Sequence, residues 1–468
     1  MTIWINATTS YNWEGPVVGI VRTEKEFICQ FLKFSEEECK LFSVKDKRTY
    51  EIINKEVYKN KFNSIQINKS EKEEKVLKKD ENVSVPALLF PLLTKKQAIL
   101  NISQGILSLA PSFSRPLVNL FLKKSKNICS YLIRIRKFKK HNEGKTKHIQ
   151  SHQSPNIINL PIKTGDTLIS LGLDWDNLNF DDIYSLKKGK GIKVISFCYD
   201  VIPIKFPQYC CFDSSKLFKE YFISLSSVSD MVICISNKSK SDLRNVLFRL
   251  GCNIPKLEVV HLASWNKKET TTKNESDFCF GHNIELGKFI LFVSTVERRK
   301  NHELLYKAYH ILLERYERDT VPTLVFVGLK GWGVEDLYKD IKLDPLIKDK
   351  ILFLGRVDDV ELEKLYKNCL FVCFPSFYEG WGLPVQEAFS FGKFVISSNG
   401  GSLPEVGGEL AEYADPYNAS EWAEKIYYFS NNLNELTQRE EKIKQLYQAR
   451  SWKDFYLDVV SKIENFEQ

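Results

Sequence analysis

The chain of 468 residues lacks the marks of several protein classes. Its 11 cysteines include no Cys-x-x-Cys pair and none at metal-ligand spacing from a histidine. We therefore predict neither a disulfide framework nor a metal site, and expect cysteines in apolar runs such as 232–235 and 371–374 to be core residues. No basic segment followed by an apolar one opens the sequence, and no 18-residue apolar run occurs. These absences predict a cytoplasmic protein without a membrane-spanning helix.

The excess of positive charge is confined to one segment. Lys and Arg number 67 against 59 Asp and Glu, a net charge of +8. Ten basic residues and one acid lie between Lys123 and Lys147, which gives this segment +9 and leaves the rest of the chain near neutrality. A nucleic-acid-binding protein would spread such charge over a face of its fold, so we predict no nucleic-acid partner.

The basic segment follows an apolar stretch that begins at Val83. From 117 to 147, apolar and aromatic side chains are interleaved with Lys and Arg. This pattern suits contact with anionic lipid, at about 1 kcal/mol per basic residue close to the surface. A solvated insertion is the alternative interpretation. We predict that residues 117–147 bind the anionic surface of the inner membrane, which would make the protein a peripheral one.

Short apolar runs alternate with helical patterns over most of the chain. In the second half the runs cover 289–294, 324–328, 351–355, 370–375 and 394–398. Buried strands alternating with helices predict parallel sheets covered on both faces. A loop-like composition at 264–287 divides two such regions.

The predicted fold class is therefore α/β, with two doubly wound, Rossmann-like domains facing a central cleft. The first domain is assigned to 1–268, with the basic and apolar insertion at about 83–150, and the second to 286–450. First-domain strands are expected at 3–6, 167–171, 193–197 and 231–235, with helices over 17–33 and 237–250. A final helix at 451–468 carries an apolar stripe.

One loop of the second domain concentrates candidate binding residues. A strand is predicted to end at Pro375 and a helix to begin at Pro384. Glycines before that helix, among them Gly382, let a ligand approach the backbone closely. The free N–H groups of the helix start, around Leu383, suit an anion such as phosphate.

Two carboxylates flank this helix start. Glu379 lies in the loop and Glu387 about one turn into the helix. Since like charges repel, neither is expected to contact a phosphate, and both are suited to accept hydrogen bonds from the hydroxyls of a sugar or a ribose.

Cations follow the first strand of the same domain. Arg299 can bind a diphosphate with two parallel hydrogen bonds, and Lys300 supplies a compact charge. A charged surface turn is the alternative, but the cations and the glutamates in one domain favour a diphosphate clamp.

Together these motifs resemble family 4 glycosyltransferases of the GT-B fold. In the second half, the resemblance includes the pair Glu379-x7-Glu387, the Arg299-Lys300-Asn301 turn, Gly331-Trp332, Leu354-Gly355 and residues 402–406. In the first half it includes residues 15–22, 199–207 and 235–239. Within the family, the pattern is most similar to bacterial O-antigen mannosyltransferases of the mannosyltransferase B type. Residues from about 50 to 160 match no pattern in this family.

The resemblance implies roles for individual residues. Four would be catalytic: Glu379 at the donor sugar, Arg299 and Lys300 at the departing diphosphate, and Asp200 on the acceptor side. Five would bind the donor nucleotide: Glu387 at the ribose, and Gly382, Leu383, Gly19 and Gly15 at the phosphates.

This sequence also departs from the family pattern. Ser294 stands where glycine is common, Arg298 where proline is common and Tyr199 where histidine is frequent, so no histidine base is assigned. The only Asp-x-Asp, at 174–176, lies in the first half and is interpreted as a loop. No metal and no cofactor are expected.

The implied activity is transfer of a hexose with retention of configuration. Mannose from GDP-mannose is the favoured donor, and a lipid-linked polysaccharide of the O-antigen or capsule type the favoured acceptor. Two alternatives stay open: the same fold with a UDP- or dTDP-linked sugar, and a catalytically silent membrane-associated binding protein. Loss of Glu379, of Glu387 or of the diphosphate clamp would have favoured the silent binding protein, but the sequence contains all of them.

Overall fold

The computed structural model describes residues 2–15, 17, 19–35, 38–47, 49–62, 159–210, 214–264 and 284–467. The chain divides into two compact units, Met1–Asn60 with Asn156–Gln468, and Lys61–Pro155. Apart from residues 61 and 62, everything described below belongs to the first unit. The segment 117–147, for which we predict membrane contact, lies outside the described residues.

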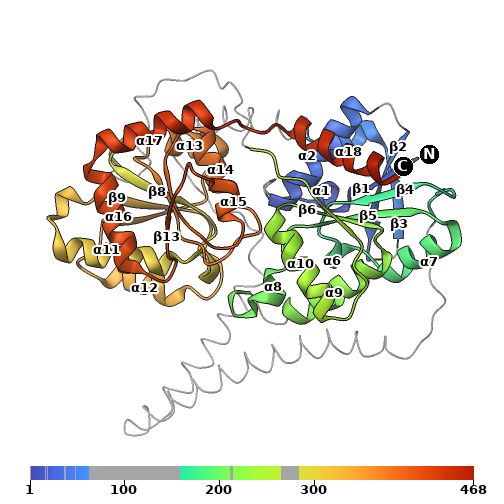
Figure 1. Cartoon of the computed structure of the whole chain (residues 1–468), viewed down its shortest axis with the longest axis horizontal. Helices are drawn as coiled ribbons and strands as arrows, with labels where there is room; N and C mark the ends of the chain where they lie inside the picture. The colour runs from blue at the N-terminus through green and yellow to red at the C-terminus, as the bar shows by residue number, and fades with distance from the viewer. Residues whose placement is uncertain are drawn as a thin grey trace, which may run out of the picture. The chain divides into compact units, whose positions relative to one another are not determined.

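The first unit contains two sheets with helices packed against them (Figure 1). The sheet of the N-terminal lobe has the order β3-β2-β1-β4-β5-β6-β7, parallel throughout except for the antiparallel pair of β2 and β3. Its strands are β1 (Ile3–Asn6), β2 (Cys39–Lys45), β3 (Thr49–Ile53), β4 (Thr167–Ser170), β5 (Lys193–Cys198), β6 (Met231–Cys234) and β7 (Lys256–Val259).

Helices of this lobe connect successive parallel strands, as a doubly wound sheet requires. They are α1 (Thr8–Asn12), α2 (Gly19–Phe34), α6 (Asp174–Asn177), α7 (Phe180–Lys190), α8 (Ile202–Lys205), α9 (Ser214–Val228) and α10 (Asn237–Arg249).

The C-terminal lobe contains a wholly parallel sheet in the order β10-β9-β8-β11-β12-β13. Its strands are β8 (Phe289–Val293), β9 (Thr323–Val327), β10 (Ile351–Gly355), β11 (Val372–Phe374), β12 (Val395–Ser398) and β13 (Glu412–Ala414). Its helices are α11 (His302–Arg315), α12 (Glu335–Leu343), α13 (Asp359–Asn368), α14 (Leu383–Ser390), α15 (Leu403–Gly407), α16 (Ala419–Asn431) and α17 (Leu433–Leu446).

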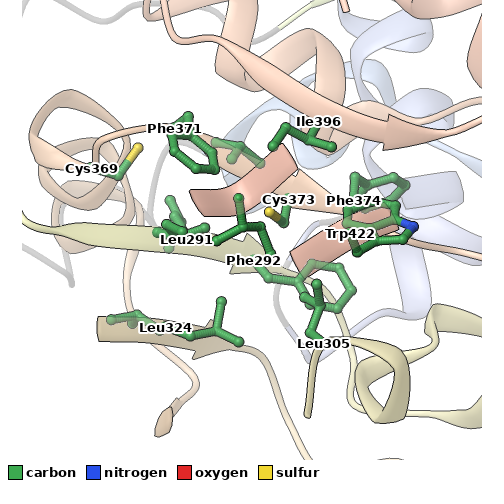
Figure 2. Close-up of a cluster of buried hydrophobic side chains, with 14 of the residues drawn as sticks. Leu291, Phe292, Leu305, Leu324, Cys369, Phe371, Cys373, Phe374, Ile396 and Trp422 are labelled. Atoms are coloured by element: carbon green, nitrogen blue, oxygen red, sulfur yellow. The ribbon is translucent and has the colours of Figure 1, made fainter. Parts of the chain in front are cut away.

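The core of the C-terminal lobe explains why its strands read as unbroken apolar runs. Figure 2 shows side chains of β8, β9 and β11 packed together with Leu305 of α11 and Trp422 of α16. Phe292, Phe374 and Trp422 are essentially inaccessible to solvent. Because helices cover both faces of this sheet, residues that point either way are buried and no polar alternation remains.

The last helix, α18 (Trp452–Glu467), packs against α2 of the N-terminal lobe. Phe455 lies 6.3 Å from Phe27 between ring centroids, and Tyr456 lies 5.6 Å from Phe31 in an edge-on arrangement. The apolar stripe of this helix therefore covers α2, and the chain ends on the lobe in which it began.

Several element bounds differ from the sequence-based expectations. The helix expected at 17–33 begins at Gly19, and the helix expected to begin at Pro384 begins one residue earlier, at Leu383. The Asp-x-Asp segment interpreted as a loop is a short helix, α6, so that interpretation was wrong. Its first residue, Asp174, is buried and accepts a hydrogen bond of 2.6 Å from Ser170, a contact invisible without the fold.

All eight cysteines within the described ranges are free, and five of them are buried: Cys39, Cys198, Cys234, Cys369 and Cys373. Their burial matches the core role expected from the apolar runs around them. Among the helices that the structure describes, none is both long and apolar enough to cross a bilayer.

Candidate functional site

The order of strands in the C-terminal lobe places two loops side by side. From β8 the chain moves outward to β9 and β10, then returns to β11 on the other side of β8. The loops that follow β8 and β11 therefore diverge at a topological switch point, where open α/β sheets bind their ligands. The loop after β8 carries Arg299 and Lys300, and the loop after β11 carries Glu379.

These two loops are joined by hydrogen bonds to their backbones. The side-chain amide of Asn301 donates to the carbonyl of Pro375 at 3.1 Å and to that of Pro416, after β13, at 2.8 Å, and the Phe377 N–H donates to the Arg299 carbonyl at 2.9 Å. Asn301 itself adopts a left-handed conformation (φ 61°), which ends the 3-10 turn Arg298–Lys300 and begins α11. The cations are thus fixed relative to the β11 loop by hydrogen bonds that do not involve their own side chains.

Arg299 and Lys300 both bind Glu379. Arg299 Nη1 donates to Glu379 Oε2 and Lys300 Nζ donates to Glu379 Oε1, each at 2.6 Å. Nη1 also bonds the Tyr378 carbonyl at 3.0 Å, and Nη2 bonds Glu297 Oε1 at 2.9 Å. The three side chains are only 17%, 15% and 10% exposed. We call Arg299, Lys300, Glu379 and Glu297 the switch-point cluster.

Burial and charge act in opposite directions on this cluster. For Glu379, burial raises the pKa, but Arg299 and Lys300 outweigh it and hold the pKa at about 2. Burial and the neighbouring Arg299 lower the pKa of Lys300, and Glu379 opposes them. Burial raises the pKa of Glu297, partly offset by Arg299 and Lys300. Glu379 is consequently ionised throughout the neutral range, and its charge orients the two cations.

The loop before α14 brings its backbone close to other parts of the lobe. Gly382 precedes the helix with φ 147°, a conformation that residues with a Cβ rarely adopt, and an added Cβ would lie 2.7 Å from Leu403. Leu383 is the first helical residue and Pro384, which has no N–H, is the second. The N–H groups of Val385 and Gln386 bond the Gly382 carbonyl at 3.0 and 3.3 Å.

Glu387 is the fifth residue of α14 and is buried. Tyr366 of α13 donates a hydrogen bond of 2.9 Å to its Oε2. Burial raises the pKa of Glu387, while Arg22 of α2 and the bond from Tyr366 oppose the rise. The two glutamates are thus in different surroundings: Glu379 between two cations, and Glu387 beside a tyrosine with an arginine of the other lobe nearby.

We expect Glu387→Ala to weaken donor binding. Loss of a hydrogen bond to a charged group costs about 1.5 to 3 kcal/mol, which corresponds to a rise in donor Kd of about 10- to 100-fold. Titration calorimetry with the donor nucleotide measures this. Glu409→Ala, which removes an exposed carboxylate of the same lobe, is the control. Equal donor affinities in the two variants would contradict the role of Glu387.

Asp200 lies directly against the β11 loop. A Cβ on Gly380 would come 2.8 Å from Asp200 Cβ and 2.5 Å from the Tyr199 carbonyl, so only glycine fits there. Ser236 and Ser239, at the start of α10, donate hydrogen bonds of 2.9 and 3.2 Å to the Gly380 carbonyl. The N-terminal lobe therefore contacts the residue next to Glu379.

One oxygen of Asp200 is already engaged, because Oδ1 accepts a bond of 2.9 Å from the N–H of Ile202 and so caps its own turn. Burial raises the pKa of Asp200, and Arg299 opposes that rise. The structure thus places Asp200 within electrostatic reach of the switch-point cluster.

Gly15 and Gly19 differ in their surroundings. Gly19 begins α2 with φ 53°, and an added Cβ would meet nothing within 4 Å, so the space beside it is open. A Cβ on Gly15 would lie 2.9 Å from the Trp13 indole nitrogen. Ile20, which follows Gly19, lines the same cavity as Arg299, whereas no contact of Gly15 with the cluster is seen among the described residues.

Sequence reasoning missed Glu297 and Tyr366. Glu297 stands in the same charged run as Arg299, and its burial beside that arginine would have been the signal. Tyr366 lies in a helix 21 residues before Glu387, and no local pattern connects the two. In the described part of the chain, no group of three or more Asp, Glu, His or Cys residues is arranged to hold a metal ion.

Comparison with known proteins assigns the C-terminal lobe to a family. Residues 278–446 match the model of the glycosyl transferases group 1 family. This range includes Arg299, Lys300, Glu379 and Glu387, and it covers all six strands of the second sheet.

Several relatives are mannosyltransferases by name. The chain is 40% identical over 128 residues to the O-antigen chain mannosyltransferase B of Escherichia coli. This aligned segment covers 27% of this chain and 33% of that protein. It is 27% identical over 221 residues to the serotype-specific mannosyltransferase WbdA of Escherichia coli, covering 46% of this chain and 26% of that one. The chain therefore spans a third or less of the length of these relatives.

Two of the solved structures that resemble this chain have TM-scores above 0.5. Anabaena Alr3699/HepE, in complex with UDP and glucose, superposes with a TM-score of 0.53 at 11% identity, covering 99% of this chain and 100% of that one. A glycosyltransferase from Rickettsia africae ESF-5 gives a TM-score of 0.52 at 16% identity, covering 100% and 98%. With two Rossmann-like lobes and a switch-point cluster in the second, the chain has the GT-B fold and carries a glycosyltransferase domain of group 1.

Proposed function

We propose that the protein transfers mannose from GDP-mannose, with retention of anomeric configuration, to a lipid-linked polysaccharide of the O-antigen or capsule type. The observation that carries this proposal is the switch-point cluster of a group 1 domain, in which Arg299 and Lys300 are fixed side by side at the sheet edge. The choice of mannose and of the acceptor is supported by the mannosyltransferase names of the relatives.

The reaction breaks the bond between the anomeric carbon and the donor phosphate oxygen, and forms a bond from an acceptor hydroxyl oxygen to the same face of that carbon. Negative charge collects on the departing diphosphate. Arg299 and Lys300 stabilise this charge, because fixed donors in a site of low water content need no reorganisation as charge develops. A phosphate oxygen of the leaving group takes the acceptor proton, so the step is balanced without a protein base.

Glu379 has two roles in this proposal. Its ionised carboxylate holds the two cations in place before the donor arrives, and its remaining lone pairs can accept hydrogen bonds from hydroxyls of the donor sugar. Lys300 bonds Glu379 with one of its three N–H groups, so an ammonium oriented in this way can still donate to a phosphate. Glu387 accepts bonds from the ribose, and Asp200 lies on the acceptor side.

A donor screen tests this function. The full-length protein is incubated with a lipid-linked acceptor extract and with GDP-mannose, UDP-sugars or dTDP-sugars in turn, and products are identified by mass spectrometry. We expect transfer from GDP-mannose. Transfer only from a UDP- or dTDP-sugar would contradict the donor assignment, and no transfer from any donor would favour a silent binding protein. The anomeric configuration of the product, read by NMR, tests retention.

We expect the transfer rate to be independent of divalent metal. The charge that Mg²⁺ or Mn²⁺ supplies to a diphosphate in other enzymes is here supplied by Arg299, Lys300 and the positive end of the α14 dipole. Rates measured with EDTA and with added Mg²⁺ should agree within about twofold. A loss of activity in EDTA that Mg²⁺ restores would contradict a metal-free mechanism.

The basic segment is proposed to bind the protein to the cytoplasmic face of the inner membrane. Replacing the ten Lys and Arg residues between 123 and 147 with Gln should abolish sedimentation with phosphatidylserine vesicles, at about 1 kcal/mol of binding free energy per residue. Hydrolysis of the donor in the absence of acceptor is the control measurement for an intact donor site. Undiminished sedimentation of the neutralised variant would contradict this membrane contact.

A further inference from the structure

An aromatic cavity of about 420 Å³ lies next to the switch-point cluster. It lies at the carboxyl ends of β4 and β5. The switch point of the N-terminal sheet is next to it, between β1 and β4, because the chain leaves β1 for β2 and β3 and later adds β4 on the other side. Most of its lining comes from this lobe, and Arg299, Glu297 and Trp332 complete it from the other lobe.

The wall of the cavity is a connected group of rings. Trp175 of α6 lies 4.9 Å from Phe218 and 5.6 Å from Tyr221, between ring centroids, and both partners belong to α9. Trp175 and Phe218 are only partly buried, so the rings face an open space. Figure 1 shows α6, α8 and α9 on the same side of the N-terminal sheet, and α9 packs against both other helices.

The charged groups of the cavity belong to the switch-point cluster or interact with it, since Asp200 is within electrostatic reach of Arg299. Asp200, Glu297 and Arg299 are the charged residues of its lining. A molecule in the cavity would therefore contact aromatic faces and meet two carboxyls and a guanidinium. Sugar rings fit such a site, because they carry apolar C–H faces and hydroxyl edges that donate to carboxyls.

The donor is a poor candidate for this cavity. Glu387 and the residues at the start of α14, which would hold its nucleotide, come from the C-terminal lobe and are not part of the described lining. The acceptor, by contrast, must bring a hydroxyl to the anomeric carbon beside Arg299 from the N-terminal side. A sugar on the aromatic wall with its hydroxyl edge at Asp200 meets that requirement.

We infer that this cavity binds the terminal hexose of the acceptor glycan, with Trp175 and Phe218 as the stacking surface that selects it. This assignment rests on the proposed function and adds residues to it that the sequence motifs do not contain. Trp332 covers the cavity from the other lobe, where its indole N–H points to the Tyr209 carbonyl at 3.4 Å.

The test uses mannotriose as an acceptor probe with the full-length protein. Saturation-transfer NMR measures its affinity for the wild type and for Trp175→Ala, Phe218→Leu and Trp332→Ala. We expect affinity to fall about two- to tenfold for each lost ring. Phe248→Ala, which removes a phenyl ring that is 77% exposed on α10, is the control and should bind as the wild type does.

Phe218→Leu keeps an apolar side chain in place, so the test survives if Trp175→Ala fails to fold. Wild-type affinity in folded Phe218→Leu and Trp332→Ala, or no binding of mannotriose to the wild type, would overturn the assignment. Donor turnover is followed in the same samples. If mannotriose binding depends on these rings but no nucleotide sugar is turned over, the proposed function is contradicted and the assignment of the sugar site is retained.

Discussion

Replacing Arg299 with alanine is expected to lower kcat by about 100- to 1,000-fold, the usual cost of removing one preorganised donor from a developing negative charge. The side chain bonds Glu379, Glu297 and the Tyr378 carbonyl, so its guanidinium is fixed before substrate arrives. Its loss removes charge from the leaving group and one of the two cations that keep the pKa of Glu379 low. Single-turnover kinetics at saturating donor measures the chemical step.

Arg298→Ala is the matched control for this prediction, because Arg298 is the same residue type, adjacent in the chain and exposed. Arg299→Lys keeps the charge but not the planar fork that bonds two carboxylates at once, so an intermediate rate is expected. Thermal unfolding of each variant separates loss of chemistry from loss of fold. A folded Arg299→Ala variant within threefold of the wild-type kcat would remove the arginine from the mechanism.

Glu24→Gln is expected to change the pH dependence of stability strongly. Glu24, on α2, is fully buried, and its Oε1 accepts bonds of 2.6 Å from both the N–H and the hydroxyl of Ser10. Burial raises the pKa of Glu24 to about 8. Nearby, burial raises the pKa of Asp174 to about 7, so both buried carboxyls of the N-terminal lobe keep their protons to a higher pH than they would in water.

The sign of the effect follows from proton counts. Between pH 4.5 and 8 the folded protein holds the Glu24 proton and the unfolded chain releases it, so the free energy of unfolding falls as pH rises through this window. Each pKa unit corresponds to about 1.4 kcal/mol, which makes the total loss several kcal/mol. Glutamine resembles the protonated acid and does not titrate. The variant should therefore lose less stability than the wild type between pH 5 and pH 8.5.

Urea unfolding at both pH values measures this difference. Glu14→Gln, which replaces an exposed carboxyl of the same lobe, should leave the wild-type pH dependence unchanged. If Glu24→Gln and the wild type lost the same stability between pH 5 and pH 8.5, Glu24 would have to be ionised in the folded protein. Asp174→Asn, with its narrower window from pH 3.8 to about 7, separates the contribution of the second carboxyl.

Local sequence patterns predicted the strands that bear the C-terminal site. The apolar runs at 289–294 and 370–375 became β8 and β11, because strands buried on both faces contain few polar residues. The strands β2, β3, β7 and β13 were not predicted. β3 carries three exposed residues on the edge of its sheet, and β13 has only three residues, so neither forms a distinct run without its neighbours.

The spacing of Glu379 and Glu387 is likewise local, since a loop and one turn of helix separate them. This is why the loop between β11 and α14 could be identified as a candidate site from the chain alone. The contacts that these two glutamates make could not be predicted from the sequence. Glu379 meets Arg299 and Lys300 across about 80 residues of sequence, and only the adjacency of β8 and β11 brings them together.

By itself, the sequence determined the α/β class, the positions of most strands along the chain and the residue types gathered at the second switch point, because periodicity and loop composition act over short distances. The tertiary structure decided which of those residues contact one another and how the contacts change their pKa values. It made Glu379 an ionised partner of two cations, raised the pKa of Glu24 by burial, and placed Trp175, from the segment interpreted as a loop, in the wall of the aromatic cavity. Desolvation and long-range pairing produce these effects, and both depend on neighbours that are distant in the chain.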